Sequence, residues 1–187
     1  LAEKLLGSSQ VFIKLVASQA GLSQDREGAV RQMVELITVE TPKVTAALSE
    51  GRAIGSYSLA QGFLNSSAST AFDELLLELE KLHAEYGLNL QEALAGNVAA
   101  QNGLGSLAEA SRQSLKDSGV LFEDQVIIAD SLDTPWAQFY DQVSQEMAKT
   151  YAFNDGLLAF LDSQLSERLA ENRAQMVLLV VALVVVF

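Results

Sequence analysis

Apolar residues recur every three or four positions along almost the whole chain, and this spacing predicts α-helices rather than strands. The apolar face of a first helix is formed by Leu1, Leu5, Phe12, Leu15 and Val16. Residues 21–25, GLSQD, predict a turn in which Gly21 ends that helix and Asp25 caps the next one. A short second helix is expected from the apolar positions Val30, Met33, Val34 and Ile37.

The middle of the chain carries one start signal and one break signal. Thr41-Pro42 predicts a new helix, because threonine is a good cap and proline suits the first helical turn. This third helix is expected to end near Gln61, and the polar stretch at 65–70, NSSAST, predicts a break. The apolar seam of a fourth helix is expected at Phe72, Leu75, Leu76, Leu79 and Leu82.

The second half is punctuated by Gly87, Gly96, Gly103 and Gly105. Each of these glycines lowers the expected helix stability by about 1 kcal/mol relative to alanine. Helix is expected to resume through Leu107, Leu115, Leu121 and Val126. Asp133-Thr134-Pro135 is the clearest start signal in the chain, and residues 154–156, NDG, predict a kink or a break in the last helix. The seam of that helix is expected at Trp136, Phe139, Tyr140, Val143, Met147, Tyr151, Leu158, Leu161 and Leu165.

Long helices joined by short turns predict an all-α fold, either an antiparallel up-and-down helical bundle or two stacked bundles.

Residues 176–187, MVLLVVALVVVF, contain no polar side chain and follow a charged helical stretch. We interpret them as the start of a transmembrane helix that continues the last helix, and residues 1–175 as the domain outside the membrane. Twelve helical residues rise only ~18 Å against a hydrocarbon core of ~30 Å, so further apolar sequence is expected downstream. A buried C-terminal helix or strand is the alternative. Because Leu1 stands within a helical pattern, sequence upstream is also expected.

Composition narrows the possible partners. The net charge of -12 argues against nucleic acid, whose backbone requires clustered lysine and arginine. The absence of cysteine excludes disulfides and thiolate metal sites, and a single histidine, His83, on a face that the pattern predicts to be solvated does not favour a metal ligand. We therefore expect no metal and no cofactor.

One motif has the form of a nucleotide site. Residues 103–108, GLGSLA, fit the G-x-G-x-x-A pattern, and Glu123 and Asp124 follow about twenty residues later. The motif requires a preceding strand, whereas its surroundings have a helical pattern. No nucleophile stands beside a base anywhere in the sequence, so we expect that the protein is not an enzyme.

A ligand site is expected around Arg52. This arginine stands between Gly51 and Gly55, small residues that allow a neighbouring helix to approach closely. In an acidic domain such an arginine can receive a carboxylate. Tyr57, Trp136 and Tyr140 are the residues expected to form the aromatic walls of this site. The alternative is that the aromatic residues belong to the hydrophobic core and that Arg52 is solvated or ion-paired.

Residues 15–55 resemble the helical extracytoplasmic sensor region of bacterial transmembrane receptors. The similarity lies in the turn at 21–25, the Thr41-Pro42 restart and the G-R-x-x-G element at 51–55. The family's usual proline after the aspartate is Arg26 here, and its paired tyrosines are Ala29 and Val30. The resemblance implies a transmembrane helix on each side of the domain and a cytoplasmic output domain.

The resemblance implies a function: a ligand-sensing domain of a bacterial chemoreceptor (a methyl-accepting chemotaxis protein) in the inner membrane, with this domain in the periplasm. A small molecule, such as a carboxylate, or a periplasmic binding protein would be its ligand, and the receptor would be a homodimer. The alternatives are the sensor of a histidine kinase or diguanylate cyclase, a membrane-anchored structural or interaction bundle, and a membrane-tethered enzyme.

Overall fold

The computed structural model describes the backbone of residues 2–186 and the side chains of residues 11–179 and of Val181. In this part of the chain every regular element is a helix and no strand is present, so the all-α prediction is confirmed. The elements are α1 (Ala2–Gln19), the 3-10 turn η1 (Leu22–Gln24), α2 (Gly28–Glu35), the π-helical segment η2 (Leu36–Glu40), α3 (Thr41–Gln61), α4 (Ser66–Ala95), α5 (Val98–Phe122), the π-helical segment η3 (Glu123–Ile127) and α6 (Trp136–Val186).

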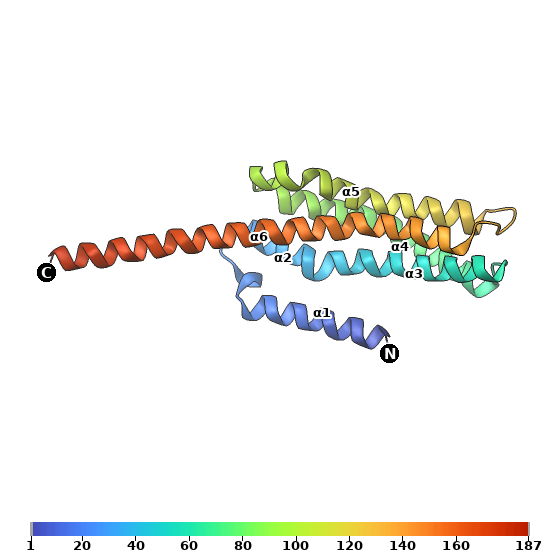
Figure 1. Ribbon diagram of the computed structural model, residues 1–187, viewed down its shortest axis with the longest axis horizontal. Coiled ribbons are helices and arrows are strands. Elements are labelled where there is room, and N and C mark those ends of the chain that lie inside the picture. The colour runs from blue at the N-terminus through green and yellow to red at the C-terminus, as the bar shows by residue number, and fades with distance from the viewer. Residues whose placement is uncertain (1, 187) are drawn as a thin grey trace.

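Helices α3, α4, α5 and α6 run side by side, and contacts join α3 to α4, α4 to α5, α5 to α6 and α6 back to α3 (Figure 1). Helix α2 packs on α4, whereas α1 lies apart from α3–α6 and contacts mainly η1 and η2. We call residues 28–161, which hold nearly all of the hydrophobic core, the helical body. Of the predicted apolar face of α1, Phe12, Leu15 and Val16 have exposed side chains outside this core, whereas Leu1 and Leu5 lie outside the residues whose side chains are described.

Short connections between the long helices are fixed by asparagine and glycine. Gly62 ends α3 with a φ of 73°, and its N–H donates to the carbonyls of Ser58 and Leu59. Asn65 then caps α4, because its side-chain oxygen accepts from the N–H of Ala68 at 2.9 Å. Asn97 caps α5 in the same way at 3.0 Å. The predicted break at 65–70 is therefore too long, because the serines after Asn65 form the first turn of α4.

Helix α3 begins at Thr41 with Pro42 in its first turn, as predicted, but the predicted threonine cap is wrong. The chain stays helical from α2 through η2 into α3, and no side chain caps α3. Proline lacks an N–H and its ring crowds the carbonyl four residues earlier, which normally bends a helix. Here the residues before Pro42 widen into the π-helical segment η2, a local change of pitch of the kind that lets a helix accommodate such a contact.

Glycines inside the second half interrupt less than predicted. Gly103 and Gly105 lie within α5, and Gly156 lies within α6, which runs unbroken for 51 residues. A Cβ on Gly156 would approach Leu107 at 3.1 Å and Leu104 at 3.2 Å, so this glycine serves the close packing of α6 on α5 and not a kink. The start of α6 at Trp136, directly after Pro135, agrees with the prediction.

The buried face of α6 agrees with the predicted seam at Phe139, Val143, Met147 and Leu161 and departs from it at other positions. Trp136, Tyr140, Tyr151 and Leu158 are exposed. The buried positions are Phe139, Val143, Met147, Thr150, Phe153, Leu157 and Leu161. Thr150 continues the helical period of the buried face, but an apolar pattern does not identify it because threonine is polar.

Beyond the helical body, the described side chains at the apolar end of α6 are exposed. The side chains of Met176, Val177, Leu178, Leu179 and Val181 are helical and 56–70% exposed. The alternative of a buried C-terminal helix or strand is therefore wrong for these residues. Within the described residues, no helix has an apolar stretch of the length and low charge needed to cross a membrane.

Candidate functional site

Two aromatic rings pack against α3 at the two glycines that flank the predicted arginine. A Cβ added to Gly51 would lie 2.3 Å from the ring of Phe122, and one added to Gly55 would lie 2.4 Å from the ring of Phe139. The expectation that these glycines permit a close approach is therefore confirmed. Because Phe139 belongs to α6, the contact draws α6 against α3 beside Arg52.

Arg52 bridges α3 and α6. It is half-buried, and its Nη1 donates a hydrogen bond to Oγ of Ser144 at 2.8 Å. Ser144 in turn donates to the backbone carbonyl of Tyr140 at 2.6 Å. The guanidinium carbon of Arg52 also lies 4.4 Å from the centre of the Tyr140 ring, within the range of a cation–π contact.

The charge of Arg52 is not matched by a carboxylate. Among the described residues, the ion pairs involve other cations, and none of them includes Arg52. A hydroxyl and an aromatic face are neutral partners, and a carboxylate binds a guanidinium more strongly than either of them. The arrangement can therefore receive an anion by exchanging a neutral hydrogen bond for a charged one.

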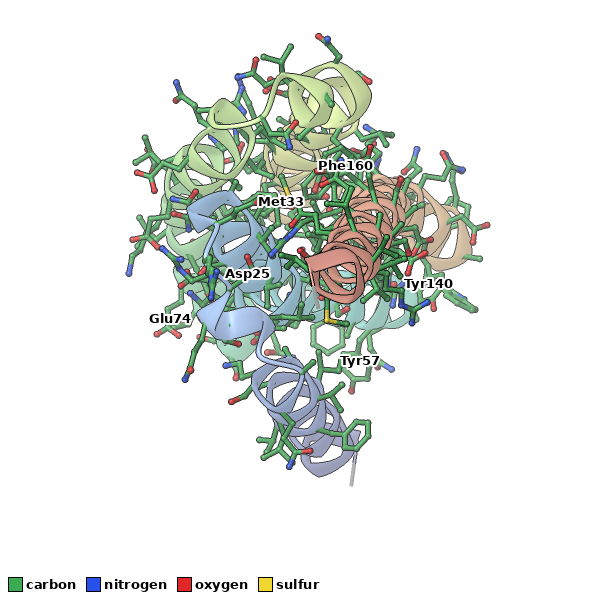
Figure 2. All side chains as sticks on the ribbon, turned by 90° about the vertical axis from the view of Figure 1, so that its left-hand side faces the viewer. Asp25, Met33, Tyr57, Glu74, Tyr140 and Phe160 are labelled. Carbon is green, nitrogen blue, oxygen red and sulfur yellow. The ribbon has the colours of Figure 1, made fainter. Side chains whose placement is uncertain are left out.

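The predicted aromatic walls lie at different distances around this arginine. Tyr140 contacts it directly, and Trp136 stands one helical turn earlier on α6, 53% exposed. Tyr57 follows Arg52 by five residues on α3, which places it about 140° away around the helix. It is 61% exposed, and Figure 2 shows Tyr57 and Tyr140 at separate places on the outside of the molecule.

Two features of this region were not predicted. Ser144, the hydrogen-bond partner of Arg52, stands four residues after Tyr140, so the pattern Trp136-Tyr140-Ser144 places all three on one stripe of α6. That spacing was readable in the sequence, but the choice of arginine facing it was not. His83 was expected on a solvated face, whereas it is half-buried and hydrogen-bonded to Arg112 on α5.

The helical surroundings expected for residues 103–108 are confirmed, and these residues do not form a nucleotide-binding loop. These residues lie inside α5, and no strand precedes them in the described part of the chain. A helix interior has its N–H groups bonded within the helix, so it cannot cradle a phosphate as a glycine-rich loop does. Among the residues whose placement is described, no group of three or more histidine, aspartate or glutamate side chains could hold a metal ion.

Comparison with known proteins gave no match to a family model, to a curated protein or to a solved structure.

Proposed function

We propose that this chain is the extracytoplasmic sensor domain of a bacterial transmembrane receptor, in the first place a chemoreceptor of the inner membrane. On this proposal the helical body is an up-and-down bundle in the periplasm, and the apolar end of α6 begins a transmembrane span. The resemblance of residues 15–55 to such sensors supports it. The chain would not be an enzyme.

The observation that carries the proposal is the course of α6. This helix begins beside Arg52, packs along the helical body and continues without a break into the exposed apolar residues from Met176 onward. At 1.5 Å per residue its 51 residues extend about 75 Å. A rigid helix of this length carries a displacement made at one end to the other.

Arg52 gives a ligand a way to act on α6. In the described state its guanidinium holds Ser144 and the ring of Tyr140, both on α6. A carboxylate bound to the same guanidinium would compete for the bond to Ser144 and weaken this link between α3 and α6. A ligand shifts a conformational equilibrium only through such a difference in contacts between two states.

The proposal includes partners. The ligand is a small carboxylate or a periplasmic binding protein, and the receptor is a homodimer. The exposed apolar side chains of α1 favour a protein partner, because monomeric proteins seldom expose such a run on one helix. The same observation favours the second candidate function, a membrane-anchored bundle that binds a protein and senses no small molecule. A histidine kinase or diguanylate cyclase output remains the alternative to chemotaxis signalling.

The test is isothermal titration calorimetry of the protein against a panel of organic acids and amino acids. A charge-assisted contact contributes roughly 1.5–3 kcal/mol, so Arg52→Ala is expected to weaken binding about tenfold to a hundredfold with the fold retained. Arg52→Lys is expected to recover little if the carboxylate is held by both guanidinium nitrogens. Arg26→Ala, which removes an equal charge from a segment outside the helical body, is the matched control.

An unchanged affinity in Arg52→Ala, for an acid that the wild type does bind, removes this arginine from the site. Absence of binding across the panel favours the protein-binding alternative over direct sensing.

A further inference from the structure

The outer surface between α4 and α5, away from Arg52, is hollowed in two adjoining places. One hollow, of about 470 Å³, is lined by residues that include Gly87, Leu94, Gly105 and Arg112. The other, of about 800 Å³, is lined by residues that include Leu76, Lys116 and Gly119. His83 belongs to the lining of both, so it stands where the two hollows meet.

His83 is held as a hydrogen-bond acceptor. Its Nε2 lies 3.0 Å from Nη1 of Arg112, and since arginine only donates, the ring nitrogen accepts. The ring is therefore neutral, with its proton on Nδ1. Arg112 is fixed from the other side by Glu109, whose two carboxylate oxygens accept from Nε at 2.9 Å and from Nη2 at 2.6 Å.

The first hollow combines this polar cluster with an apolar interior. Leu90 and Leu94 are buried at its floor, and Leu88 is exposed at its rim. Gly87 lets the stem of Arg112 lie flat across the groove, because a Cβ there would come within 2.9 Å of Arg112 Cδ. Gly105 has nothing within 4 Å of such a Cβ and leaves the opposite wall open.

Two cations near His83 can attract an anion, although carboxylates outnumber cations in the lining of the two hollows and the whole chain carries a net charge of -12. The charged groups that line the hollows are Arg112, Lys116 and Glu109 on α5, Glu123 on η3, and Asp73 and Glu80 on α4, the helix of His83. Among the described residues Lys116 forms no ion pair. Burial, together with the charges of Arg112 and Lys116, holds the pKa of His83 below its usual value, so the ring is neutral at pH 7.

We propose that the first hollow binds a small monocarboxylate with an apolar body, held by Arg112 and by His83 in its protonated form. A protonated ring can no longer accept from Arg112, and the two cations repel each other until an anion bridges them. Leu88, Leu90 and Leu94 cover the apolar body of the ligand. Affinity therefore rises as the pH falls, and by reciprocity the bound carboxylate raises the pKa of His83. This site is separate from Arg52 and does not depend on the sensor function.

The experiment is a titration of the wild-type protein with benzoate, followed by NMR of the histidine ring at about pH 5.5 and at about pH 7.5. His83 is the only histidine in the chain, so its ring signals need no assignment. Saturable shifts are expected at the lower pH, with binding about tenfold weaker at the higher pH. The pKa of His83 is expected to be higher at saturating benzoate than in its absence.

Four variants locate the site by calorimetry with benzoate. Arg112→Gln is expected to weaken binding at least about tenfold. Glu109→Gln is expected to strengthen it, because it frees the guanidinium, and a folding defect cannot produce this gain. His83→Gln keeps an acceptor for Arg112 and is expected to remove the pH dependence. Lys81→Gln, an equal charge change at an exposed position on α4, is expected to change the affinity less than about twofold.

Absence of saturable benzoate binding at both pH values overturns the proposal. So does binding that Arg112→Gln leaves unchanged. Binding that is lost in Arg52→Gln and kept in Arg112→Gln assigns the ligand to the α3–α6 site instead.

Discussion

The two halves of the helical body are held together by different kinds of contact. In the half near the 62–65 and 128–135 connections, Phe72, Phe122 and Phe139 pack ring to ring, with centroids 5.7 and 6.0 Å apart. In the half near the α4–α5 turn, hydroxyls meet instead. The Tyr86 hydroxyl lies 3.0 Å from Ser111 Oγ, which donates to Thr150 Oγ1 at 3.1 Å.

This difference shows which structural property, side-chain volume or helix register, each half of the helical body depends on. The aromatic half depends on volume, because two of its rings occupy space that only Gly51 and Gly55 leave open. The hydroxyl half depends on the axial register of α5 against α6, because a hydrogen bond tolerates less displacement than an apolar contact. Substitutions that change volume should therefore matter most in the first half, and those that remove a hydroxyl should matter in the second.

The largest effect is expected for Phe122→Ala. Phe122 is fully buried and joins the other two rings, and truncating such a phenylalanine costs about 3–5 kcal/mol. Urea unfolding followed by circular dichroism measures the loss in the free energy of unfolding. A loss below about 1 kcal/mol would mean that the aromatic cluster does not hold this half.

Gly55→Ala tests the same half from the opposite direction. Its Cβ would overlap the Phe139 ring, and overpacking of this kind costs about 1–3 kcal/mol. Gly103→Ala is the matched control in α5, where nothing lies within 4 Å and the alanine is expected to stabilise by up to about 1 kcal/mol. Thermal unfolding of both variants should give shifts of opposite sign, and equal shifts would contradict the role of Gly55.

Tyr86→Phe tests the hydroxyl half. It removes one hydroxyl from a buried network, while the hydrogen bond from Ser111 to Thr150 stays in place. The free energy of unfolding is therefore expected to fall by about 0.5–1.5 kcal/mol. Tyr57→Phe, at an exposed position, should leave the free energy of unfolding unchanged within about 0.5 kcal/mol. A stabilised Tyr86→Phe protein would show that the apolar packing of the ring, and not its hydroxyl, matters here.

The smallest effect is expected where α6 leaves the helical body. Both carboxylate oxygens of Asp25 accept from Arg168 at 3.2 Å. Burial alone would raise the pKa of Asp25, but the bonds from the Glu27 N–H and from Arg168 outweigh it, and the pKa lies below 3.8. The contribution of this pair is therefore present above about pH 4 and is lost as the pH falls through the lowered pKa.

For a partly exposed pair the expected contribution is at most about 1 kcal/mol. The difference in unfolding free energy between wild type and Asp25→Asn should be present at neutral pH and disappear in acid. A difference that persists at about pH 2 would assign the effect to the amide itself and not to the charge.

Local signals predicted the fold well wherever one residue decides the backbone. Pro135 and the polar residues before it placed the start of α6, and Gly21 lies at the end of α1 with a φ of 74°. The same reasoning located the start of α3 at Thr41-Pro42 but not the π-helical segment η2 that joins it to α2, and it failed at Gly103, which lies inside α5.

The candidate site was less predictable because it depends on contacts between distant positions. The glycines beside Arg52 indicated a close helix approach, but not that Phe122 and Phe139 would occupy it. Arg52 and Ser144 are 92 residues apart, and no local pattern selects one as the partner of the other. For the same reason the bond between His83 and Arg112 could not be foreseen from the solvated pattern around His83.

The π-helical segment η2 sets a rotational phase between the helices that it joins. Each residue of an α-helix turns the chain by about 100°, so one residue more or fewer rotates everything beyond it by that angle. Val30, Met33 and Val34 before η2 and Val44 and Leu48 after it are all buried. A π-helical turn holds about one residue more than an α-helical turn, so the five residues of η2 turn the chain about as far as four α-helical residues would. With one residue deleted, the segment could become α-helical and α2 would keep nearly the same facing, whereas an uninterrupted α-helix of unchanged length would turn α2 by about 100°. The facing of α2 on the helical body is thus set by the match between the number of residues in this segment and its helical pitch.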